Sequence, residues 1–600
     1  MDASEKKSLL VDAQRESAQI ISAITQQIPV AEQVVHDTKI EMSRTHSSEA
    51  VSLIQNLLAI RQLQLTGLKE AHDSPYFVRC DVELDTDKTP KTLRFGKFSI
   101  PEFGIYSWTT PAARIRFNKP GSFSYTTNAR NEISGQMSRV DQYLIVQREI
   151  RFMTTEMIGV PRTLIHQEKF SSHKTEFMLP EIVERMEKAQ DDIIRADAYG
   201  SFLISGPAGS GKTTLALHRV AYLLQAPEYA DQFDPRKILV LVQDDGSKQY
   251  FEKLLPSLGI TNVGISTFDL WAMDLLGLST LSYIRHYGNS ESERDLYEAS
   301  KYQALKEHAA GHQKDPFDLL EKCYYSHFSD SQKELFATQR EAKVLDRFDL
   351  TLLLRAHLDT KGAFTKRQRV YSRTVKDTVK TSMQDVEVKY SLIVVDEVQN
   401  YLPEQIHALQ SCISEKTKAM IYVGDLAQQT SLFALRDWAH VGEEFTNGRS
   451  VHLSKVYRST RQILEYIQST GFEVDIPKGI REGSKVHESI MPQTDIFRKI
   501  KEIFERSGDE LIGIIGLQSE DIEPYLQFKT QHHKVMTAVE AQGLEFDIVI
   551  FIRNQDDTHQ KYPENLRTEK TKVIRDQVYV ALTRAMNELH VFDVTLNSPL

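Results

Sequence analysis

A glycine-rich loop at residues 206–214 constrains the fold of this chain more than any other stretch. It reads GPAGSGKTT, follows the apolar segment SFLIS, and leads into LALHRVAYLL, whose apolar residues share one helical face. In the pattern G-x-x-x-x-G-K-S/T, backbone N–H groups surround phosphates, the lysine reaches the β- and γ-phosphates, and the hydroxyl can ligate Mg²⁺. We therefore expect an ATP site formed by Gly206, Pro207, Ala208, Gly209, Ser210, Gly211, Lys212 and Thr213.

Two neighbouring acids supply the second signal. The segment SLIVVDEVQNY at 391–401 contains an apolar run typical of a buried parallel strand, with Asp396 and Glu397 at its carboxyl end. Beside a phosphate loop, the first carboxylate holds Mg²⁺ together with Thr213, and the second orients or deprotonates the attacking water. The competing interpretation is a strand capped by acids on a solvated loop.

Three further polar residues stand where a nucleotide could be sensed. The strand-like AMIYVGDLAQQT ends in Gly424, Asp425 and Gln428, and an amide at that strand end can report hydrolysis of the γ-phosphate. Arg458 in VYRST and Arg584 in VALTRA offer planar guanidinium groups suited to a transferring phosphoryl group. An isolated arginine is more often a surface residue, so the case for both depends on the other motifs.

The order of these motifs resembles superfamily 1 helicases of the UvrD/Rep type over about residues 186–596. The stretches that carry the resemblance are GPAGSGKTT, VVDEVQN, VGDLAQQ, VYRST, AVEAQGLEFDIV and YVALTRA. It implies an α/β fold with two RecA-like P-loop domains that bind ATP and Mg²⁺ between them. It also implies that Gln190 reads the adenine, Tyr457 stacks on it and Glu545 contacts the ribose. Gln542 departs from the pattern, because a lysine usually stands there.

Other stretches resemble one branch of that family, the HelD-like proteins that act on bacterial RNA polymerase. They are SPYFVRCDVEL, IYSWTTPAARIRF, AQDDIIRAD, GKTTLALHRVAYLL, DEVQNYLPEQ and YRSTRQILEY. The resemblance makes RNA polymerase a possible partner. One observation weighs against this partner. Only about 115 residues lie between ISTFDLWA and SLIVVDEVQNY, whereas a second arm that enters the polymerase channel would need a longer insertion.

The residues before the phosphate loop change periodicity twice. Up to residue 74, apolar residues such as Val51, Ile54 and Leu58 recur at three- and four-residue steps and predict a coiled-coil-like helical arm, with an earlier helix kinked or ended at Pro29. Alternation in YFVRCDVEL and in ARIRF then predicts a β-rich module. The expected domains are 1–74, the arm; 75–180, the β-rich module; 181–275 with 389–445, the first RecA-like domain; 276–388, a helical insertion; and 446–600, the second RecA-like domain.

Charge leaves the choice of partner open. The net charge of -10 means that nucleic acid must bind at a local basic site. The basic segment at residues 361–380 reads KGAFTKRQRVYSRTVKDTVK and holds seven Lys/Arg against one acid. This composition suits a channel that binds single-stranded nucleic acid. The alternative is a solvated helix face, which is the commoner interpretation of such a charged run.

Three functions compete for this sequence: a 3′ to 5′ single-stranded DNA translocase or helicase, a HelD-like ATPase that remodels or recycles RNA polymerase, and a nucleotide-gated scaffold. The intact motifs favour an ATPase. With no signal segment and no long apolar run, we expect a cytoplasmic protein without a membrane partner.

Overall fold

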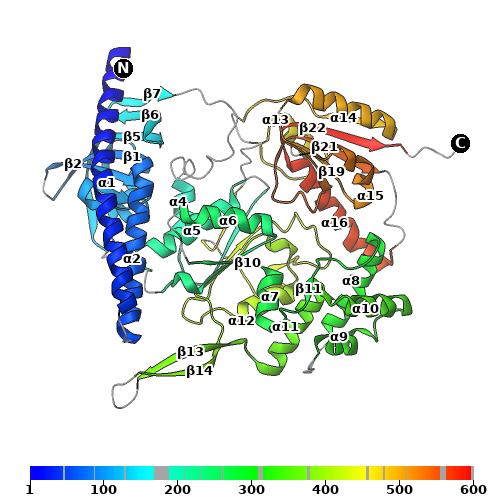
Figure 1. The fold of residues 1–600 in the computed structure, drawn as a ribbon. Coiled ribbons are helices and arrows are strands. Elements are labelled where there is room, and N and C mark those ends of the chain that lie inside the picture. Colours follow the sequence, from blue (N-terminus) through cyan, green and yellow to red (C-terminus); the bar gives the residue numbers. More distant parts are fainter. Residues whose placement is uncertain are drawn as a thin grey trace.

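The computed structural model extends over residues 1–600 and contains two parallel sheets, a β-rich module and a long helical pair (Figure 1). The residues that it describes are all except 45–47, 87, 128–129, 168–187, 208–209, 227, 230–231, 258–259, 261, 308–314, 374–378, 447, 454–458, 477–479, 509, 531, 555–561 and 596–600. No helix in these described ranges combines the length and apolar character that a membrane crossing requires.

The first RecA-like sheet is parallel, with strand order β10-β9-β15-β16-β8-β17. Its strands are β8 (Ser201–Ser205), β9 (Ile238–Val242), β10 (Gly264–Thr267), β15 (Leu392–Val395), β16 (Ala419–Val423) and β17 (Ser450–His452). Continuous apolar runs such as ILVLV form the central strands because helices cover both faces. Those helices are α4 (Lys188–Ile194), α5 (Lys212–Gln225), α6 (Asp245–Ser257), α7 (Phe268–Leu276) and α12 (Pro403–Ser411). Because β17 pairs with β8, we place the change of domain after His452 and not at residue 446.

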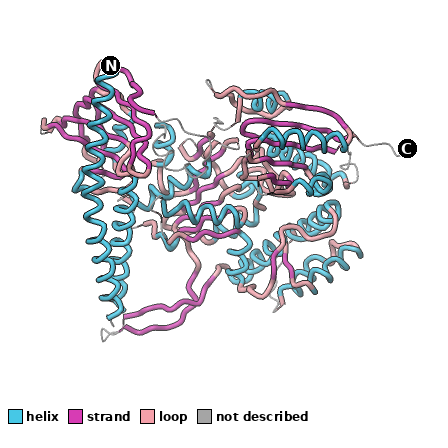
Figure 2. The backbone as a smooth tube through the Cα atoms, turned by 45° about the horizontal axis from the view of Figure 1, so that its top comes forward, coloured by secondary structure: helices cyan, strands magenta, loops and turns pink. Residues whose placement is uncertain are grey.

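The insertion between β10 and β15 combines helices with a β-hairpin. Its elements are β11 (Ser282–Tyr283), α8 (Glu291–Lys306), α9 (Pro316–Tyr324), α10 (Asp330–Glu341), β12 (Val344–Leu345), α11 (Arg347–Lys361), β13 (Thr365–Arg373) and β14 (Val379–Glu387). Strands β13 and β14 pair only with each other and project from the body (Figures 1 and 2). The basic run at 361–380 is therefore mostly hairpin, and the helix-face interpretation of it is wrong.

The second RecA-like sheet is also parallel, with order β18-β22-β21-β19-β20. The strands are β18 (His487–Met491), β19 (Ile512–Gly516), β20 (His533–Thr537), β21 (Phe546–Asn554) and β22 (Ala585–Val594), and the helices are α13 (Arg461–Ser469), α14 (Gln493–Ser507), α15 (Ser519–Ile522) and α16 (Glu564–Thr583). Separate apolar cores fill its two faces. The fold class expected from the sequence, α/β with two RecA-like domains, is confirmed.

The N-terminal region forms a sheet with two long helices along it. The strands are β1 (Val78–Leu84), β2 (Pro90–Gly96), β3 (Ile105–Ser107), β4 (Gly121–Thr126), β5 (Glu132–Val146), β6 (Glu149–Met157) and β7 (Val160–Gln167), and the helices are α1 (Ala3–Arg44) and α2 (Ser48–Asp73). Ala13, Ile20 and Ile24 of α1 pack on this sheet, and Glu16 pairs with Arg79 at 2.7 Å. The helical pair thus stands against the β-rich module at one side of the molecule (Figure 1).

Helix α1 continues through Pro29 and does not end there, and its packing on α2 offsets one lost backbone hydrogen bond. One local expectation for this region is wrong. The stretch ARIRF forms a 3-10 helix at Pro111–Phe117 and not a strand. Proline favours its start, and buried Arg116 lies 3.5 Å from Asp191 of α4, so this turn joins the module to the first RecA-like domain.

The module and helix α5 share one core. Trp108 is buried and its ring meets His218 of α5 edge to face, with centroids 5.9 Å apart. Arg195 donates hydrogen bonds to the backbone oxygens of Trp108 and Thr109 at 2.6 and 3.0 Å. Arg219 of α5 donates to the backbone oxygens of Ile193, Ile194, Ala196 and Asp197, which terminates α4. These contacts fix the helix that follows the phosphate loop.

Candidate ATPase site between the two parallel sheets

The phosphate loop connects β8 to α5 in a conformation that glycine permits. Gly206 has φ +140°, and a Cβ there would lie 2.3 Å from the backbone oxygen of Leu453. The hydroxyl of Ser210 is buried and has no hydrogen-bond partner among the described residues, so it is a free donor inside the loop. An orphaned donor at a helix N-terminus is what a bound phosphate would satisfy. Ala208 and Gly209 lie outside the described residues.

Lys212 and Thr213 begin α5 and face the acidic strand end. The ammonium group of Lys212 is buried and donates to the backbone oxygen of Pro207 at 3.0 Å. Burial lowers the pKa of Lys212, while the carboxylates of Glu397, Asp425 and Asp396 oppose that shift. The hydroxyl of Thr213 donates to Asp396 Oδ1 at 3.0 Å, which brings the two expected Mg²⁺ ligands together.

Asp396 and Glu397 follow β15 at its carboxyl end. Burial and the adjacent Glu397 raise the pKa of Asp396 to about 7, and the hydrogen bond from Thr213 works against this. A buried carboxylate beside a second carboxylate favours a bound cation, so these residues fit Mg²⁺. Thr213 and Asp396 are the residues that would hold it.

Glu397 has a left-handed backbone conformation, with φ +50°, and its carboxylate is restrained by two amides. Gln399 Nε2 donates to Glu397 Oε2 at 2.6 Å, and Gln542 Nε2 from the second RecA-like domain donates to the same oxygen at 3.0 Å. A non-glycine residue in this region of φ and ψ is uncommon and often functional. The carboxylate proposed to act on water is therefore positioned by both domains.

Gln428 connects the end of β16 to the phosphate loop. Its Nε2 donates to Asp425 Oδ2 at 2.6 Å and approaches the backbone oxygen of Gly206 at 3.4 Å. Gly424 allows this strand end to come close, because a Cβ there would lie 2.1 Å from Gln399 Oε1. The motif that contains Gln428 thus lies beside the phosphate loop.

Arg584 reaches the same cleft from the second RecA-like domain. It is buried at the end of α16 and donates to the backbone oxygens of Val580 and Leu544 at 3.0 and 3.1 Å. Burial lowers the pKa of Arg584, and the nearby carboxylate of Glu397 opposes that shift. The guanidinium group is therefore held by two backbone oxygens within the electric field of Glu397.

Of the residues predicted to contact the base and the ribose, the structure describes Gln190 and Glu545. Gln190 is half-buried in α4, and Glu545 is half-buried directly before β21. Tyr457 and Arg458 lie outside the described residues. The roles proposed for Gln190, Tyr457, Glu545 and Arg458 remain predictions.

A cavity of about 690 Å³ opens beside the phosphate loop. Pro207, Asp425 and His452 line it from the first domain, and Lys572, Arg575 and Tyr579 of α16 line it from the second. Its Lys/Arg lining residues are Lys572 and Arg575, and its acidic lining residues are Asp425, Glu473, Asp475 and Asp576, so the space carries both signs of charge.

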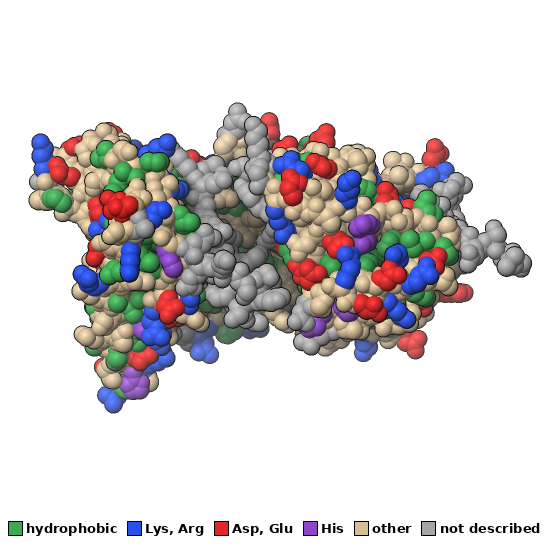
Figure 3. All heavy atoms as spheres, turned by 90° about the horizontal axis from the view of Figure 1, so that it is seen from above, with side chains coloured by type: hydrophobic (Ala, Val, Ile, Leu, Met, Phe, Trp, Pro, Cys, Tyr) green, Lys and Arg blue, Asp and Glu red, His purple; other side chains and the backbone are tan. Residues whose placement is uncertain are grey.

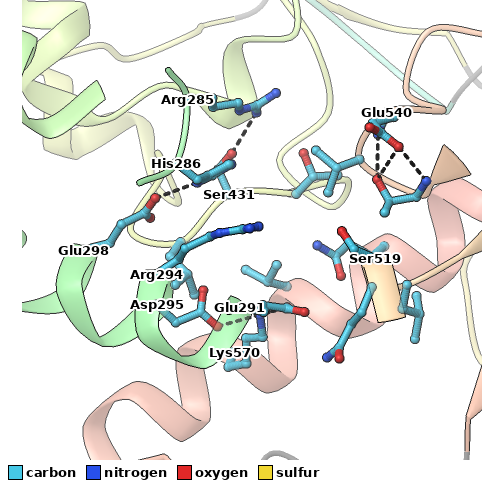
Figure 4. A pocket seen from close by; sticks show the side chains of 18 of the residues that line it. Arg285, His286, Glu291, Arg294, Asp295, Glu298, Ser431, Ser519, Glu540 and Lys570 are labelled. Carbon is cyan, nitrogen blue, oxygen red and sulfur yellow. Dashed lines mark hydrogen bonds and ion pairs between the residues drawn. The ribbon is translucent and has the colours of Figure 1, made fainter. Parts of the chain in front are cut away.

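A second cavity of about 450 Å³ lies where the first domain, the insertion and the second domain meet (Figure 4). Helix α8 contributes Arg294, which points into the cavity, and the second domain contributes Ser519 and Glu540. Its acidic lining residues are Asp244, Glu291, Asp295, Glu298 and Glu540, and its Lys/Arg lining residues are Arg285, Arg294 and Lys570. A third cavity, of about 340 Å³, adjoins Glu397 and Asn400.

Comparison with known proteins identifies the core. Residues 186–437 match the model of the UvrD/REP helicase N-terminal domain. That part of the chain is therefore similar to a UvrD/REP-type helicase domain. Residues 343–593 also match the model of the viral superfamily 1 RNA helicase core domain.

One curated relative is similar to part of the helicase region. It is the ATP-dependent DNA helicase PcrA of Bacillus subtilis (strain 168), which is 23% identical over 278 residues, covering 44% of this chain and 36% of PcrA. The match thus spans about a third of the relative's length. Residues 1–185, which include the helical pair and the β-rich module, lie outside both matched domain models.

Sequence reasoning missed two amide side chains of the candidate ATPase site. Gln399 follows the acidic pair by two residues, so its proximity to Glu397 was available as a signal. Gln542 was noticed only as a departure from the usual lysine. Its contact with Glu397, 145 residues away, depends on how the two domains meet.

Proposed function

We propose that this chain is a superfamily 1 ATPase that uses ATP hydrolysis to move along single-stranded DNA in the 3′ to 5′ direction. The observation that carries the proposal is the convergence of Thr213, Asp396 and Glu397 from the first domain with Arg584 from the second. The helicase-domain match and the similarity to a DNA helicase support this assignment.

Each residue of the site has a defined task in hydrolysis. Lys212 and the loop amides bind the phosphates, and Thr213 with Asp396 would hold Mg²⁺, which neutralises phosphate charge when bound. Glu397 orients the attacking water and takes its proton, while Arg584, together with Arg458, stabilises charge on the transferring phosphoryl group. Gln428 bridges Asp425 and the loop, so it can respond to the loss of the γ-phosphate.

Movement would come from opening and closing of the cleft between the two RecA-like domains. The cavity of about 450 Å³ is lined by Gln243 and Asp244 of the first domain and by Thr537 and Glu540 of the second, so its shape depends on how far apart the domains lie. A DNA strand bound to both domains would shift when the domains change their separation. We also propose the cytoplasm as the compartment, since both ATP and DNA are available there.

The test is ATPase activity of the purified chain with and without a thymidine oligonucleotide. We expect stimulation that falls as salt is raised, because phosphate contacts release counterions. Glu397→Gln should still bind ATP but lose about 10²- to 10⁴-fold in kcat, as expected for a missing general base. Near-normal hydrolysis by that variant would overturn the role of Glu397.

A HelD-like factor that remodels RNA polymerase is the second candidate. The observation that favours it is the α1 and α2 pair, which projects beyond the β-rich module (Figure 2) and lies outside both matched domain models. Stoichiometric co-purification with RNA polymerase after nuclease treatment would support this function. Strand-stimulated ATPase without polymerase binding would favour the translocase.

A further inference from the structure

The β-rich module meets α4, the helix that carries Gln190, through a buried ion pair. Asp191 follows Gln190 directly, and its side chain is buried. Nη2 of Arg116, in the turn at Pro111–Phe117, lies 3.5 Å from Asp191 Oδ1, and Arg195 donates to Asp191 Oδ2 at 2.8 Å. Because Arg116 is buried as well, the loss of one partner would leave the other as an uncompensated buried charge.

Two stretches singled out in the sequence, IYSWTTPAARIRF and AQDDIIRAD, lie against each other through these contacts. Arg195 of the second stretch also donates to the backbone oxygens of Trp108 and Thr109 in the first, at 2.6 and 3.0 Å. Ile194 of α4 belongs to the same apolar core as Trp108. The proposed steps of hydrolysis use no residue of either stretch, so the contact between them needs a separate explanation.

The orientation of α4 depends on its neighbours. With seven residues, α4 is too short to be a stable helix by itself. At its carboxyl end, Arg219 of α5 donates hydrogen bonds to four backbone oxygens. Successive residues are about 100° apart around a helix, so the burial of Asp191 against Arg116 also sets the direction of Gln190. The module therefore determines how α4 is rotated about its own axis.

We propose that Arg116 and Asp191 are positioning residues, through which the β-rich module orients Gln190 for selective binding of an adenine nucleotide. This inference rests on the proposed function only in treating the cleft as an ATP site and Gln190 as the contact to the base. An amide can accept a hydrogen bond from the 6-amino group of adenine and donate one to N7. Guanine has an oxygen in place of that amino group, so an amide selects adenine only while its orientation is fixed.

The experiment measures equilibrium binding of ADP and of GDP to the full chain, with Mg²⁺ present, by displacement of a fluorescent ribose-labelled ADP. The wild-type chain should bind ADP more tightly than GDP. Arg116→Met keeps an unbranched side chain but removes the charge. It should reduce the ratio of the two affinities by about threefold or more, as expected for one lost hydrogen bond to the base. A smaller fall in the ratio overturns the proposal.

Three further variants separate base selection from stability. Arg116→Lys keeps a positive charge beside Asp191 and should restore the wild-type ratio, and a ratio as low as that of Arg116→Met would overturn the role of the ion pair. Asp191→Asn removes the negative charge at nearly constant volume, should lower the ratio, and provides the measurement should Arg116→Met fail to fold. Asp192→Asn makes the same change at the next, exposed position and should retain the wild-type ratio. Equal falls in the two asparagine variants would contradict the proposal.

The outcomes distinguish this inference from the proposed function, because binding of ADP and GDP requires no DNA strand. If a thymidine oligonucleotide does not stimulate the ATPase while Arg116→Met and Asp191→Asn lower the ratio, the translocase proposal fails and the inference holds. If the oligonucleotide stimulates the wild type and both variants keep its ratio, only the inference is wrong. Equal affinity of the wild-type chain for ADP and GDP would also overturn it, since Gln190 would then not select adenine.

Discussion

At the scale of single residues, burial makes the nucleotide-binding helix sensitive to acid. His218 of α5 is fully buried against Trp108, its Nδ1 lies 2.8 Å from the backbone oxygen of Thr214, and burial lowers its pKa to about 4. An unfolded histidine titrates near its ordinary pKa of 6.5. The unfolded chain therefore takes up this proton first, and the stability present above pH 6.5 is lost as the pH falls toward 4.

We expect His218 to account for about 3 kcal/mol of lost unfolding free energy between pH 7 and pH 4. His218→Phe should lose less over the same interval, because phenylalanine does not titrate and fits the aromatic contact. Urea unfolding at both pH values measures the difference. His440→Phe, which replaces an exposed histidine, should behave as the wild type does. Equal losses in wild type and His218→Phe would contradict the prediction.

The candidate site residues of the first domain were largely predictable from the sequence, while the hydrogen bonds that restrain them were not. Lys212, Thr213, Asp396 and Glu397 follow from motifs whose spacing reflects a strand, a turn and a helix. The hydrogen bond from Gln542 to Glu397 joins residues 145 apart and depends on domain placement. No pattern in one sequence specifies how two domains pack, so contacts of this kind emerge only from the structure.

At the scale of elements, α16 connects the candidate ATPase site with the insertion. Its 20 residues span about 30 Å, and about 21 Å of helix separates Lys570 from Arg584 at its end. Lys570 is buried, contacts Glu291 and lies 2.7 Å from Asp295, both on α8, and Tyr562 donates to Asp295 at 2.8 Å. The insertion is thus attached to the helix that positions the arginine.

Lys570→Met should destabilise the chain by about 2–4 kcal/mol, because it leaves two partly buried acids without their cation. The variant should also hydrolyse ATP more slowly, since α16 loses its attachment and Arg584 its fixed position. Urea unfolding and ATPase assays test both effects. Lys529→Met, at an exposed lysine of the same domain, provides the control. Unchanged stability would show that the acids relax into solvent.

The β13 and β14 hairpin tests the strand-binding prediction for the basic run. Arg367 and Arg369 are exposed and two residues apart on one strand, so they share a face. Replacing both with glutamate should weaken oligonucleotide binding and reduce the slope of affinity against salt by about 1–2. Maximal ATPase at saturating oligonucleotide should remain. Arg498→Glu with Lys501→Glu, at exposed positions of α14, matches the charge change, and equal weakening by that pair would exclude a specific role for the hairpin.

At the scale of the whole molecule, the net charge is -10. Lys/Arg and Asp/Glu side chains are intermingled over the face seen in Figure 3. The first three motifs follow strands β8, β15 and β16 of the first sheet, whereas Arg584 of the last motif follows α16 in the second domain. Periodicity did not predict the β13–β14 hairpin, whose strands form a two-stranded sheet of their own. The turn at Pro111–Phe117 was not predictable from periodicity either, since tertiary contacts such as Arg116 with Asp191 favour it.

The half of the α1–α2 pair that lies away from the sheet, the distal half, allows the best test between a DNA motor and a polymerase factor. Val30, Leu57 and Ile60 are exposed there, whereas Ala13, Ile20, Ile24 and Ala71 anchor the proximal half to the sheet. The hydrogen bond from Arg61 to Thr38 and the Lys69–Glu32 ion pair, at 2.7 Å, join α1 and α2 to each other. Removing the distal half of both helices therefore leaves the packing of the proximal half on the sheet intact.

Replacing residues 30–61 with a short glycine–serine linker should keep basal and strand-stimulated ATPase within about twofold of wild type, because distant sites contribute independently. If the chain also serves RNA polymerase, the same deletion should abolish co-purification while ATPase persists. ATPase assays and nuclease-treated co-purification on one preparation measure both. Loss of ATPase in a deletion variant that still unfolds cooperatively would show that the helical pair is part of the motor, contrary to its placement on the β-rich module.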